Sequence, residues 1–384
     1  MRGVHLYLAV TAAVFALLSA RCCLNVSSDE TRTELNGCAV DFISFTEQFH
    51  RSYVANSEEF DLRHLCFQVR DTREGEWRET VTLWTFFRTY HNNKRRRTSL
   101  QATPTHNATK RHAYLNSFST VAQSAKYGIN QFSDFSQEEF RDLYLGASAD
   151  RALLFPGLKT GKTEGLPAKF DWRDKAVVAP VQNQQACGSC WAFSVVGAVQ
   201  SVHAIDGSQL VELSVQQVVD CSFQNEGCNG GSPVQALKWL KQSKMKLVPQ
   251  SEYPYKAKTG ICHFFSQSHG VVAVKNFTAY DFSGQEEAMM GHLVEHGPLA
   301  AIVDAVSWQD YLGGIIQHHC SSQRSNHAVL VVGYNTTGDI PYWIVQNSWG
   351  TTWGNEGYVY IKIGSNVCGK YELCHLVIFC LYLL

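Results

Sequence analysis

The sequence has almost no net charge, and its body has no long hydrophobic run. Lys and Arg number 33 against 34 Asp and Glu, a formal net charge of −1 over 384 residues. Nucleic-acid-binding domains carry a basic excess, so we expect no nucleic-acid partner. Past the N-terminal region no stretch reaches the length of about 18 clean apolar residues typical of a membrane span, so no stable span is expected. The hydrophobic fraction of 45% is typical of a globular protein.

The sequence also lacks a second Cys-x-x-Cys pair to match Cys187 and Cys190. A zinc site of this type needs two such pairs, and Cys221 and Cys228 have a different spacing. A redox pair would need a thioredoxin-like βαβ context, which is absent. Zinc binding and thiol–disulfide exchange are therefore disfavoured alternatives, and no metal or cofactor site is evident. The total of 13 cysteines indicates an oxidising compartment, and the odd count leaves at least one thiol unpaired within the chain.

The two ends of the chain have distinct compositions. Arg2, an apolar run over 6–18 and the small residues that follow predict a signal peptide over 1–20, with a short buried helix as the alternative. Secretion fits four predicted glycosylation sequons, at Asn25, Asn107, Asn276 and Asn335. At the C-terminus, residues 375–384 are apolar but too short to cross a bilayer, which needs about 20.

Between the ends, the composition divides the chain in two. Residues 21–165 are polar and charge-rich, and a basic run at 94–97 reads as a solvated loop or a processing site. Residues 166–384 are dense in aromatics, glycine and cysteine. A first helix is predicted over 190–206, with Ser189 as its cap, and a second after Ser214, which forms a capping box with Gln217. Two more helices are predicted, from Pro233 to Leu240 and over 285–296. Strands are predicted over 299–303, 327–334, 342–346 and 358–363. A helical lobe followed by a β lobe predicts an α+β fold with a cleft between the lobes.

The strongest local signal for chemistry is Cys190, predicted at the first turn of a buried helix. The positive end of the helix dipole favours a thiolate, which is the competent nucleophile for acyl transfer. Gly188, two residues earlier, lets a substrate backbone approach closely.

A thiolate nucleophile needs a general acid/base and a group that orients it. Among 15 histidines, His327 stands at the start of a predicted strand, where its ring would be held rigidly. Asn347 follows another strand, and its amide oxygen is suited to accept a hydrogen bond from the imidazole. Trp349 would cover that bond and exclude water.

These segments resemble the papain family of cysteine peptidases. The resemblance rests on Gln184-x5-Cys190-Trp-Ala-Phe, Asn326-His327-Ala, Asn347-Ser-Trp-Gly and Cys228-Asn-Gly-Gly231, and it runs over about 166–369. It implies the two-lobed papain-like α+β fold with a mainly helical inhibitory prodomain. It also implies that Cys190 is the nucleophile, His327 its ion-pair partner and Asn347 the residue that orients His327. The Gln184 side chain and the Cys190 backbone N–H would form the oxyanion hole.

The resemblance further implies the substrate contacts and the disulfides. Gly230 and Gly231 would bind the peptide backbone, and Trp349 would lie on the leaving-group side. The specificity pocket would be lined by Ser232, Pro233 and Ile302. The implied bridges are Cys187–Cys228, Cys221–Cys262 and Cys320–Cys368.

Residues 21–165 resemble the family's prodomain, with two departures from the pattern in the chain as a whole. Gly128-x-Asn130-x-Phe132-x-Asp134 fits one prodomain motif, and Glu59-x3-Arg63-x3-Phe67 fits the first half of another. The second half would end at Asn116, which implies an insertion at about 67–107. The other departure is the tail at 370–384, which replaces the strand expected to close the β lobe; if packed, the tail would substitute for that strand.

We therefore expect a cysteine endopeptidase of the lysosomal or secretory route, made as a zymogen. Its expected partners are protein and peptide substrates, its own propeptide and cystatin-type inhibitors, in the lysosome or the extracellular space. The alternative is a catalytically impaired isoform or a non-catalytic binding protein on the same fold.

Overall fold

A computed structural model describes residues 114–117, 124–133, 135–148, 155–156, 165–263, 270–282, 284–317, 325–364 and 377–383. The chain divides into two compact units, Met1–Thr109 and Lys110–Leu384, and every described residue belongs to the second. No helix in these ranges is long and apolar enough to cross a membrane. The signal peptide over 1–20, the insertion at about 67–107, the sequons at Asn25 and Asn107, and the Cys320–Cys368 pair fall outside the described residues.

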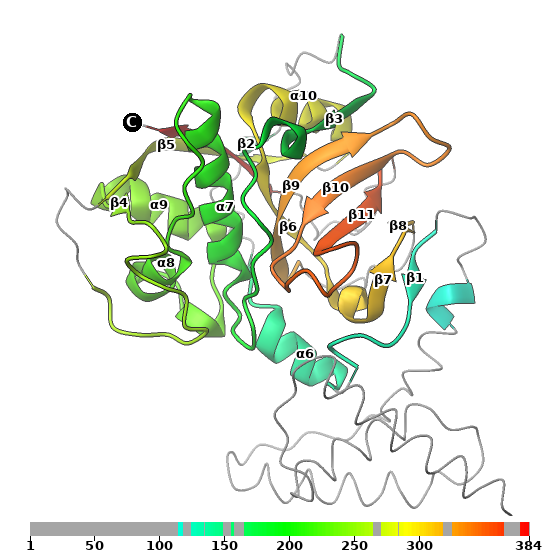
Figure 1. The fold of residues 1–384 in the computed structure, drawn as a ribbon, viewed down its shortest axis with the longest axis horizontal. Helices are drawn as coiled ribbons and strands as arrows, with labels where there is room; N and C mark the ends of the chain where they lie inside the picture. Colours follow the sequence, from blue (N-terminus) through cyan, green and yellow to red (C-terminus); the bar gives the residue numbers. More distant parts are fainter. Residues whose placement is uncertain are drawn as a thin grey trace, which may run out of the picture. The chain divides into compact units, whose positions relative to one another are not determined.

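The helices precede most of the strands along the chain (Figure 1). The α-helices are α6 (Gln137–Tyr144), α7 (Cys190–Ile205), α8 (Val215–Cys221), α9 (Pro233–Ser243) and α10 (Glu286–His296), and the 3₁₀ helices are η2 (Trp172–Lys175), η3 (Gly227–Asn229) and η4 (Val306–Asp310). The strands are β1 (Lys126–Tyr127), β2 (Phe155–Pro156), β3 (Lys169–Asp171), β4 (Lys246–Leu247), β5 (Val272–Asp281), β6 (Leu299–Val303), β7 (Tyr311–Gly313), β8 (Ile315–Ile316), β9 (His327–Asn335), β10 (Tyr342–Gln346), β11 (Tyr358–Lys362) and β12 (Val377–Leu383).

Helix α7 is the centre of the first lobe because it is apolar on nearly every face. Trp191, Val195 and Val199 are all 0% exposed. Burying each such side chain contributes about 1.5–3 kcal/mol of hydrophobic stabilisation. Helices α8 and α9 lie on one side of α7, and the strands of the second lobe lie on the other (Figure 1). The helix therefore stands at the junction of the two lobes.

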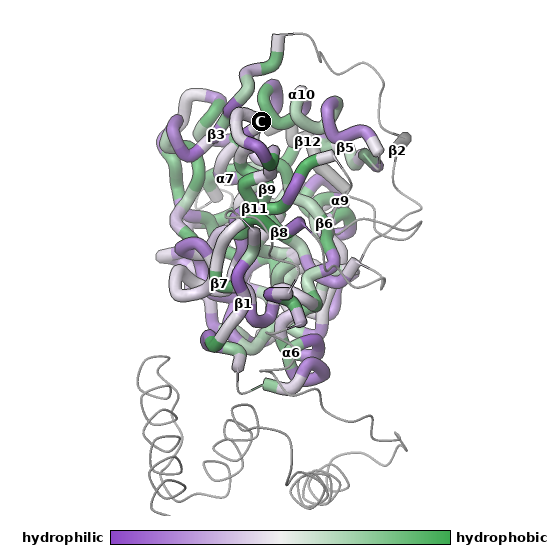
Figure 2. Tube along the Cα trace, turned by 90° about the vertical axis from the view of Figure 1, so that its right-hand side faces the viewer, coloured by the Kyte–Doolittle hydropathy of each residue, from purple (hydrophilic) through white to green (hydrophobic). Residues whose placement is uncertain are grey.

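Strand β9 is the centre of the second lobe and separates two hydrophobic cores. The sheet runs β3-β9-β10-β11-β8, and β6 also pairs with β9. Because side chains alternate along a strand, Val329 and Val331 enter the core of the β lobe, whereas Leu330 and Val332 pack in the core that contains α7. Figure 2 shows hydrophobic residues along β9 and hydrophilic residues on the outer loops and α6. The first residue of β9, His327, is thus held at the boundary between the lobes.

One predicted helix cap is wrong, and a second is confirmed only in part. The Ser189 side chain makes no capping bond to α7, because its hydroxyl instead meets the hydroxyl of Tyr255 at 2.6 Å. Ser214 does accept from the Gln217 backbone N–H, but the Gln217 side chain bonds the backbone of Lys246 and Val248 instead of completing the box. In each case a partner distant in sequence takes the side chain.

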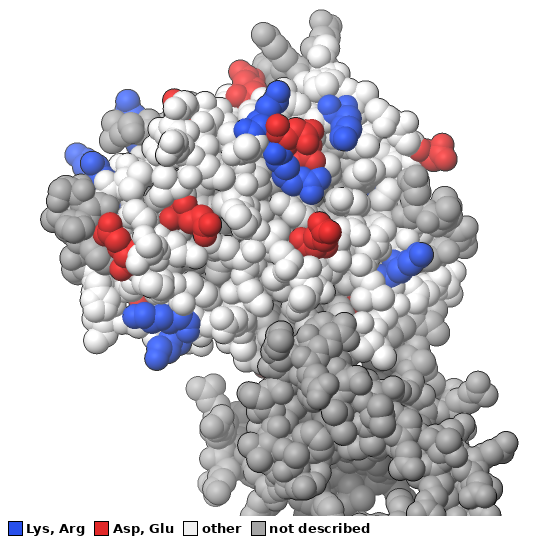
Figure 3. Space-filling view, in the orientation of Figure 1, with Lys and Arg blue, Asp and Glu red and all other residues white. Residues whose placement is uncertain are grey.

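Charged side chains are sparse on the face drawn in Figure 3. Lys and Arg lie singly or beside Asp and Glu, and no extended region of one sign is visible there. Among the described residues, Arg173 forms an ion pair with Asp171, with 2.6 Å between nitrogen and oxygen.

The atypical tail packs as a strand. Strand β12 pairs antiparallel with β5, with Val377 opposite Asp281 and Leu383 opposite Val274. It forms the edge of the sheet β12-β5-β2, and its backbone also runs beside β6 and α7. The tail thus occupies a strand position against the long strand β5, as the sequence allowed.

We expect deletion of residues 370–384 to lower the melting temperature of the protein by at least about 5 °C, because the deletion removes a whole ladder of backbone hydrogen bonds from β5. Thermal unfolding followed by circular dichroism measures this effect. A chain that lacks only Leu384, the residue after β12, is the matched control. Equal melting temperatures for the two deletions would show that β12 does not support the fold.

Candidate active site

Cys190 is the first residue of α7 and is 0% exposed. Its thiol is free of any disulfide. Backbone hydrogen bonds from Ala328, Gly146 and Trp191 face its sulfur and lower the pKa, but burial outweighs them and raises the pKa of the thiol to about 11. Ala328 directly follows His327, so the sulfur lies against the start of β9.

His327 and Asn347 form a buried pair. The His327 Nε2 lies 2.7 Å from the Asn347 Oδ1, and the Ser348 backbone N–H donates to the same oxygen at 2.8 Å. Because an amide oxygen only accepts, Nε2 carries the proton, and Nδ1 is left as the basic nitrogen. The Trp349 ring lies 4.7 Å from the His327 ring, centroid to centroid, and is 0% exposed. Trp349 therefore covers this pair.

Burial in the covered form acts against the expected ion pair. Burial lowers the pKa of His327 to about 4, and the hydrogen bonds to Asn347 and to the Tyr144 backbone raise it only in part. The pKa of each group is thus shifted toward its neutral form under the cover, and the ion pair stays a prediction for the uncovered site. The physical reason is that a segment of the chain covers both groups and excludes water from them.

That covering segment runs over 144–148 and begins at the last residue of α6. Gln184 Nε2 donates to the Tyr144 carbonyl at 3.0 Å. Gly231 N–H donates to the Gly146 carbonyl at 2.8 Å, and Ser148 N–H donates to the Gly231 carbonyl at 2.9 Å. The segment thereby forms a parallel bridge between Ala147 and Gly231. It occupies the same backbone groups that the sequence assigns to substrate binding.

The predicted glycines fit a surface that a peptide backbone approaches. A Cβ on Gly188 would lie 2.8 Å from the Cys228 carbonyl oxygen and 3.2 Å from Gly146. Gly230 has φ +127°, which side-chain-bearing residues rarely adopt. Substitution at either position would close the approach now used by Gly146.

The other predicted pocket residues lie on neighbouring elements. Ser232 precedes α9 and Pro233 begins it, and both are buried. Ile302 on β6 stands opposite Ala328 and shares an apolar cluster with Ala147 of the covering segment. The apolar side chain of Ala147 thus packs toward the predicted specificity pocket.

Gln184 is fully buried and held by three side-chain bonds. The Ser348 hydroxyl donates to its Oε1 at 2.6 Å, and its Nε2 donates to the Cys187 carbonyl at 2.8 Å as well as to Tyr144. Ser348 was not singled out from the sequence, although its place after Asn347 is a usable signal. The bond to Ser348 fixes the amide so that the nitrogen faces the covering segment.

Residues before the covering segment anchor it to the β lobe. Phe132 and Phe140 pack edge-on against Trp349, with ring centroids 5.3 and 5.2 Å away. The Gln309 side chain donates to the Phe132 carbonyl at 3.0 Å, and β1 pairs with β7.

The motif residue Asn130 donates to the Gln309 carbonyl at 2.8 Å, whereas Asp134 lies outside the described residues. Asn116 pairs with the Tyr127 backbone in both directions, at 2.9 and 3.0 Å.

Two of the three implied disulfides are present. Cys187 is joined to Cys228, which ties the loop before α7 to the segment that carries Gly230 and Gly231. Cys221 is joined to Cys262. The first bridge holds together two segments that the covering backbone contacts.

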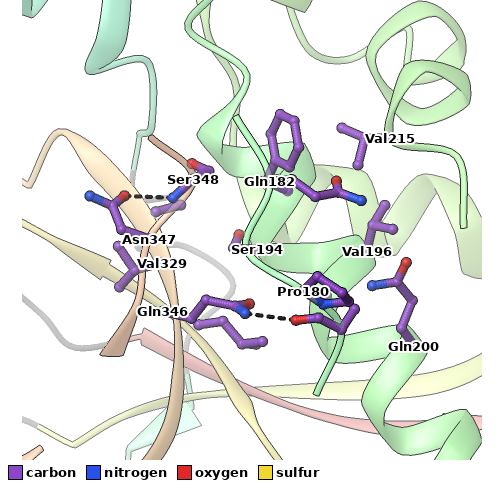
Figure 4. Close-up of a pocket in the computed structure, with 15 residues that line it drawn as sticks. Pro180, Gln182, Ser194, Val196, Gln200, Val215, Val329, Gln346, Asn347 and Ser348 are labelled. Carbon is purple, nitrogen blue, oxygen red and sulfur yellow. Dashed lines mark hydrogen bonds between the residues drawn. The ribbon is translucent and has the colours of Figure 1, made fainter. Parts of the chain in front are cut away.

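A small cavity lies behind this region and is not the cleft. It has a volume of about 30 Å³ and lies between α7 and the strands β9 and β10 (Figure 4). Asn347 and Ser348 line it, whereas Cys190, His327 and Gln184 do not. Figure 4 shows the Gln346 amide at its edge donating to the Ala179 carbonyl, at 2.8 Å. Its volume suffices for about one or two water molecules.

The comparison with protein families agrees with this geometry. The model for the papain family of cysteine proteases matches residues 166–378, which is more than half of the chain. The chain therefore belongs to the papain family of cysteine proteases. The matched range contains the motifs around Cys190, His327 and Asn347 on which the sequence resemblance rests.

Individual relatives place the chain within the family. Cathepsin O from Homo sapiens and from Mus musculus are each 57% identical to it, over 268 and 261 residues. Each match covers 67% of this chain, and 82% and 84% of the relatives. The chain is thus a papain-family cysteine peptidase homologous to cathepsin O.

Solved precursor structures confirm the fold. A digestive procathepsin L 3 from Tenebrio molitor larval midgut has a TM-score of 0.68 and 28% identity, covering 90% of this chain and 98% of its own. A recombinant stem bromelain precursor has a TM-score of 0.67 and 26% identity, with the same coverage. Both are precursors, so the likeness extends beyond the peptidase lobes.

Proposed function

We propose that this protein is a cysteine endopeptidase made as a zymogen, with Cys190 as nucleophile and His327 as general acid/base. The observation that carries the proposal is that α7, β9 and β10 bring three functional residues together. The thiol at the head of α7 lies against the start of β9, where His327 is bound to Asn347 from the end of β10. A nucleophile, a base and the group that orients the base are thereby gathered in one place.

In the proposed reaction, the Cys190 thiolate attacks the carbonyl carbon of the scissile bond. The negative charge that develops on the carbonyl oxygen is stabilised by the Gln184 Nε2 and the Cys190 backbone N–H. The C–N bond then breaks, and the His327 imidazolium gives its proton to the leaving amine. Water attacks the acyl-enzyme while His327 takes up a proton, which releases the acid and restores the thiolate.

The covering segment supports the zymogen part of the proposal. The Tyr144 carbonyl already accepts from Gln184, and the backbone around Ala147 already uses Gly231. A substrate cannot bind the same groups until this segment leaves. Removal of residues 21–165 would expose the cleft, rehydrate Cys190 and His327 and move both pKa values toward the ion pair.

The location and partners follow from the same proposal. Homology to cathepsin O and the predicted signal peptide support a lysosomal or extracellular destination. The sequons at Asn276, whose side chain is exposed, and at Asn335 are proposed glycosylation sites. Protein substrates and cystatin-type inhibitors would bind the vacated cleft, with specificity set by Ser232, Pro233 and Ile302.

The test is hydrolysis of a fluorogenic peptide amide by the full chain, expressed through the secretory route and then processed to remove the prodomain. We expect turnover that a peptidyl epoxide, which alkylates a reactive thiol, abolishes. A non-catalytic relative would bind peptide without turnover. Turnover that persists after complete reaction with the epoxide would exclude the cysteine mechanism.

A further inference from the structure

The hydroxyl of Tyr255 lies between the two segments that carry the proposed oxyanion donors. It donates to the Gln184 backbone carbonyl at 2.8 Å. It also lies 2.6 Å from the hydroxyl of Ser189, the residue before Cys190. Ser189 is 0% exposed and makes no capping bond to its own helix.

These two contacts form a directed chain of hydrogen bonds. The Gln184 carbonyl only accepts, so the single Tyr255 proton is committed to it. The Ser189 hydroxyl therefore donates to Tyr255. The chain then runs from the head of α7 through Tyr255 to Gln184, and the Ser189 hydroxyl has one longer alternative acceptor, the Cys187 carbonyl at 3.5 Å.

The span between these two segments turns sharply at Gln185, which has φ +54°, and it has no helix or strand between Gln184 and α7. Local hydrogen bonds hold it, from the Gln184 Nε2 and the Ser189 N–H to the Cys187 carbonyl. The Ser348 bond holds the Gln184 side chain from the other lobe. Tyr255 adds a side-chain bond to the Gln184 backbone from within the helical lobe.

Tyr255 is itself well anchored for this task. Its ring packs edge-on against Phe193 on the first turn of α7, with 4.9 Å between centroids. The next residue, Lys256, donates its backbone N–H to the Gln216 Oε1 at 2.8 Å. The Cys221–Cys262 bridge closes the loop that contains it.

We propose that Tyr255 is a positioning residue that sets the distance between the two oxyanion donors, the Gln184 side chain and the Cys190 backbone N–H. The inference rests on the proposed function and extends it to a residue that touches no substrate. Without the hydroxyl, the Gln184 loop and the head of α7 would lose the link through Tyr255, and the donors would be less well placed for the developing charge.

The experiment compares processed enzyme from the full chain carrying Tyr255→Phe with the wild type. We expect kcat/KM for a peptide amide to fall about tenfold, with most of the change in kcat. Binding of a peptide aldehyde, whose adduct carries an oxygen in the oxyanion position, should weaken about as much. Alkylation by iodoacetamide, which forms no oxyanion, should keep its rate and its pH profile. Ser189→Ala should give the same pattern.

Tyr334→Phe is the matched control, because it removes another tyrosine hydroxyl that donates to a backbone carbonyl, that of Pro167, at 2.8 Å. The positioning role is wrong if Tyr255→Phe has the same kcat/KM as this control. It is also wrong if Tyr255→Phe lowers the melting temperature and slows alkylation by the same factor as it lowers kcat/KM. In both cases the proposed function stands. If the wild type has no epoxide-sensitive turnover, the proposed function fails and this inference fails with it.

Discussion

Replacing Cys190 with Ala is expected to lower kcat/KM of the processed enzyme for a peptide amide by about 10⁴-fold or more. The reason is chemical: without the sulfur no acyl-enzyme forms, and the remaining donors stabilise only an uncatalysed attack by water. The substitution removes one buried heavy atom at the head of α7. Its structural cost is therefore small beside its catalytic cost, and the protein should stay folded.

Ser194→Ala is the matched control for that experiment. Ser194 lies one turn further along α7, is also buried, and donates its hydroxyl to the Trp191 carbonyl at 3.1 Å. It loses one heavy atom as well, but outside the proposed machinery, so its kcat/KM should stay within about twofold of the wild type. Activity retained by Cys190→Ala at more than a few per cent would refute the assignment of the nucleophile.

In the chain that carries Cys190→Ala, acid is expected to weaken the docking of the covering segment by about fiftyfold between about pH 7 and about pH 4.5. His327 has a pKa of about 4 in the covered form, against an ordinary 6.5. Between about pH 4 and about pH 6.5 the covered form therefore binds fewer protons than the open form. The stability of the covered form is full above pH 6.5 and is lost as the pH falls toward 4. The substitution is needed because in the wild type the thiol proton passes to His327 in the open form, which leaves the two forms with equal numbers of protons.

Hydrogen exchange of the full chain tests the acid effect. The chain would carry Cys190→Ala so that it cannot process itself. Protection of the Ala147 and Ser148 amides, which donate to Asn326 and Gly231, should fall with pH after correction for intrinsic exchange. Adding His327→Gln removes the titrating group, so the fall attributable to His327 should disappear. The same pH dependence in both chains would assign acid opening to other groups.

Much of the fold follows from local sequence. The bounds of β6 and β10 agree with the predicted strands 299–303 and 342–346, and α7 begins at Cys190 as predicted. Dense runs of apolar or β-branched residues bounded by turn residues leave little choice there. The Ser189 cap and the Gln217 half of the Ser214 capping box are absent because Tyr255 and the β4 segment, both distant in sequence, compete for Ser189 and for Gln217.

The sequence indicated the residues of the candidate site, but not that another segment covers them or how burial shifts their pKa values. Cys190, His327 and Asn347 each stand at the end of a helix or strand, so motif and position together indicate them. The sequence did not indicate that Tyr144–Ser148 lies on Gln184 and Gly231, because the register of two irregular segments depends on three-dimensional packing. For the same reason the sequence did not indicate that burial under this segment raises the pKa of Cys190 and lowers that of His327, because motifs do not encode burial.

The most direct measurement is the mass-spectrometric identification of the residue that a peptidyl epoxide modifies in the processed enzyme. Our account predicts one adduct for each chain, on the Cys190 sulfur, with labelling that tracks the loss of turnover and is absent in Cys190→Ala. An adduct on another cysteine, or complete loss of turnover with Cys190 unmodified, would contradict it.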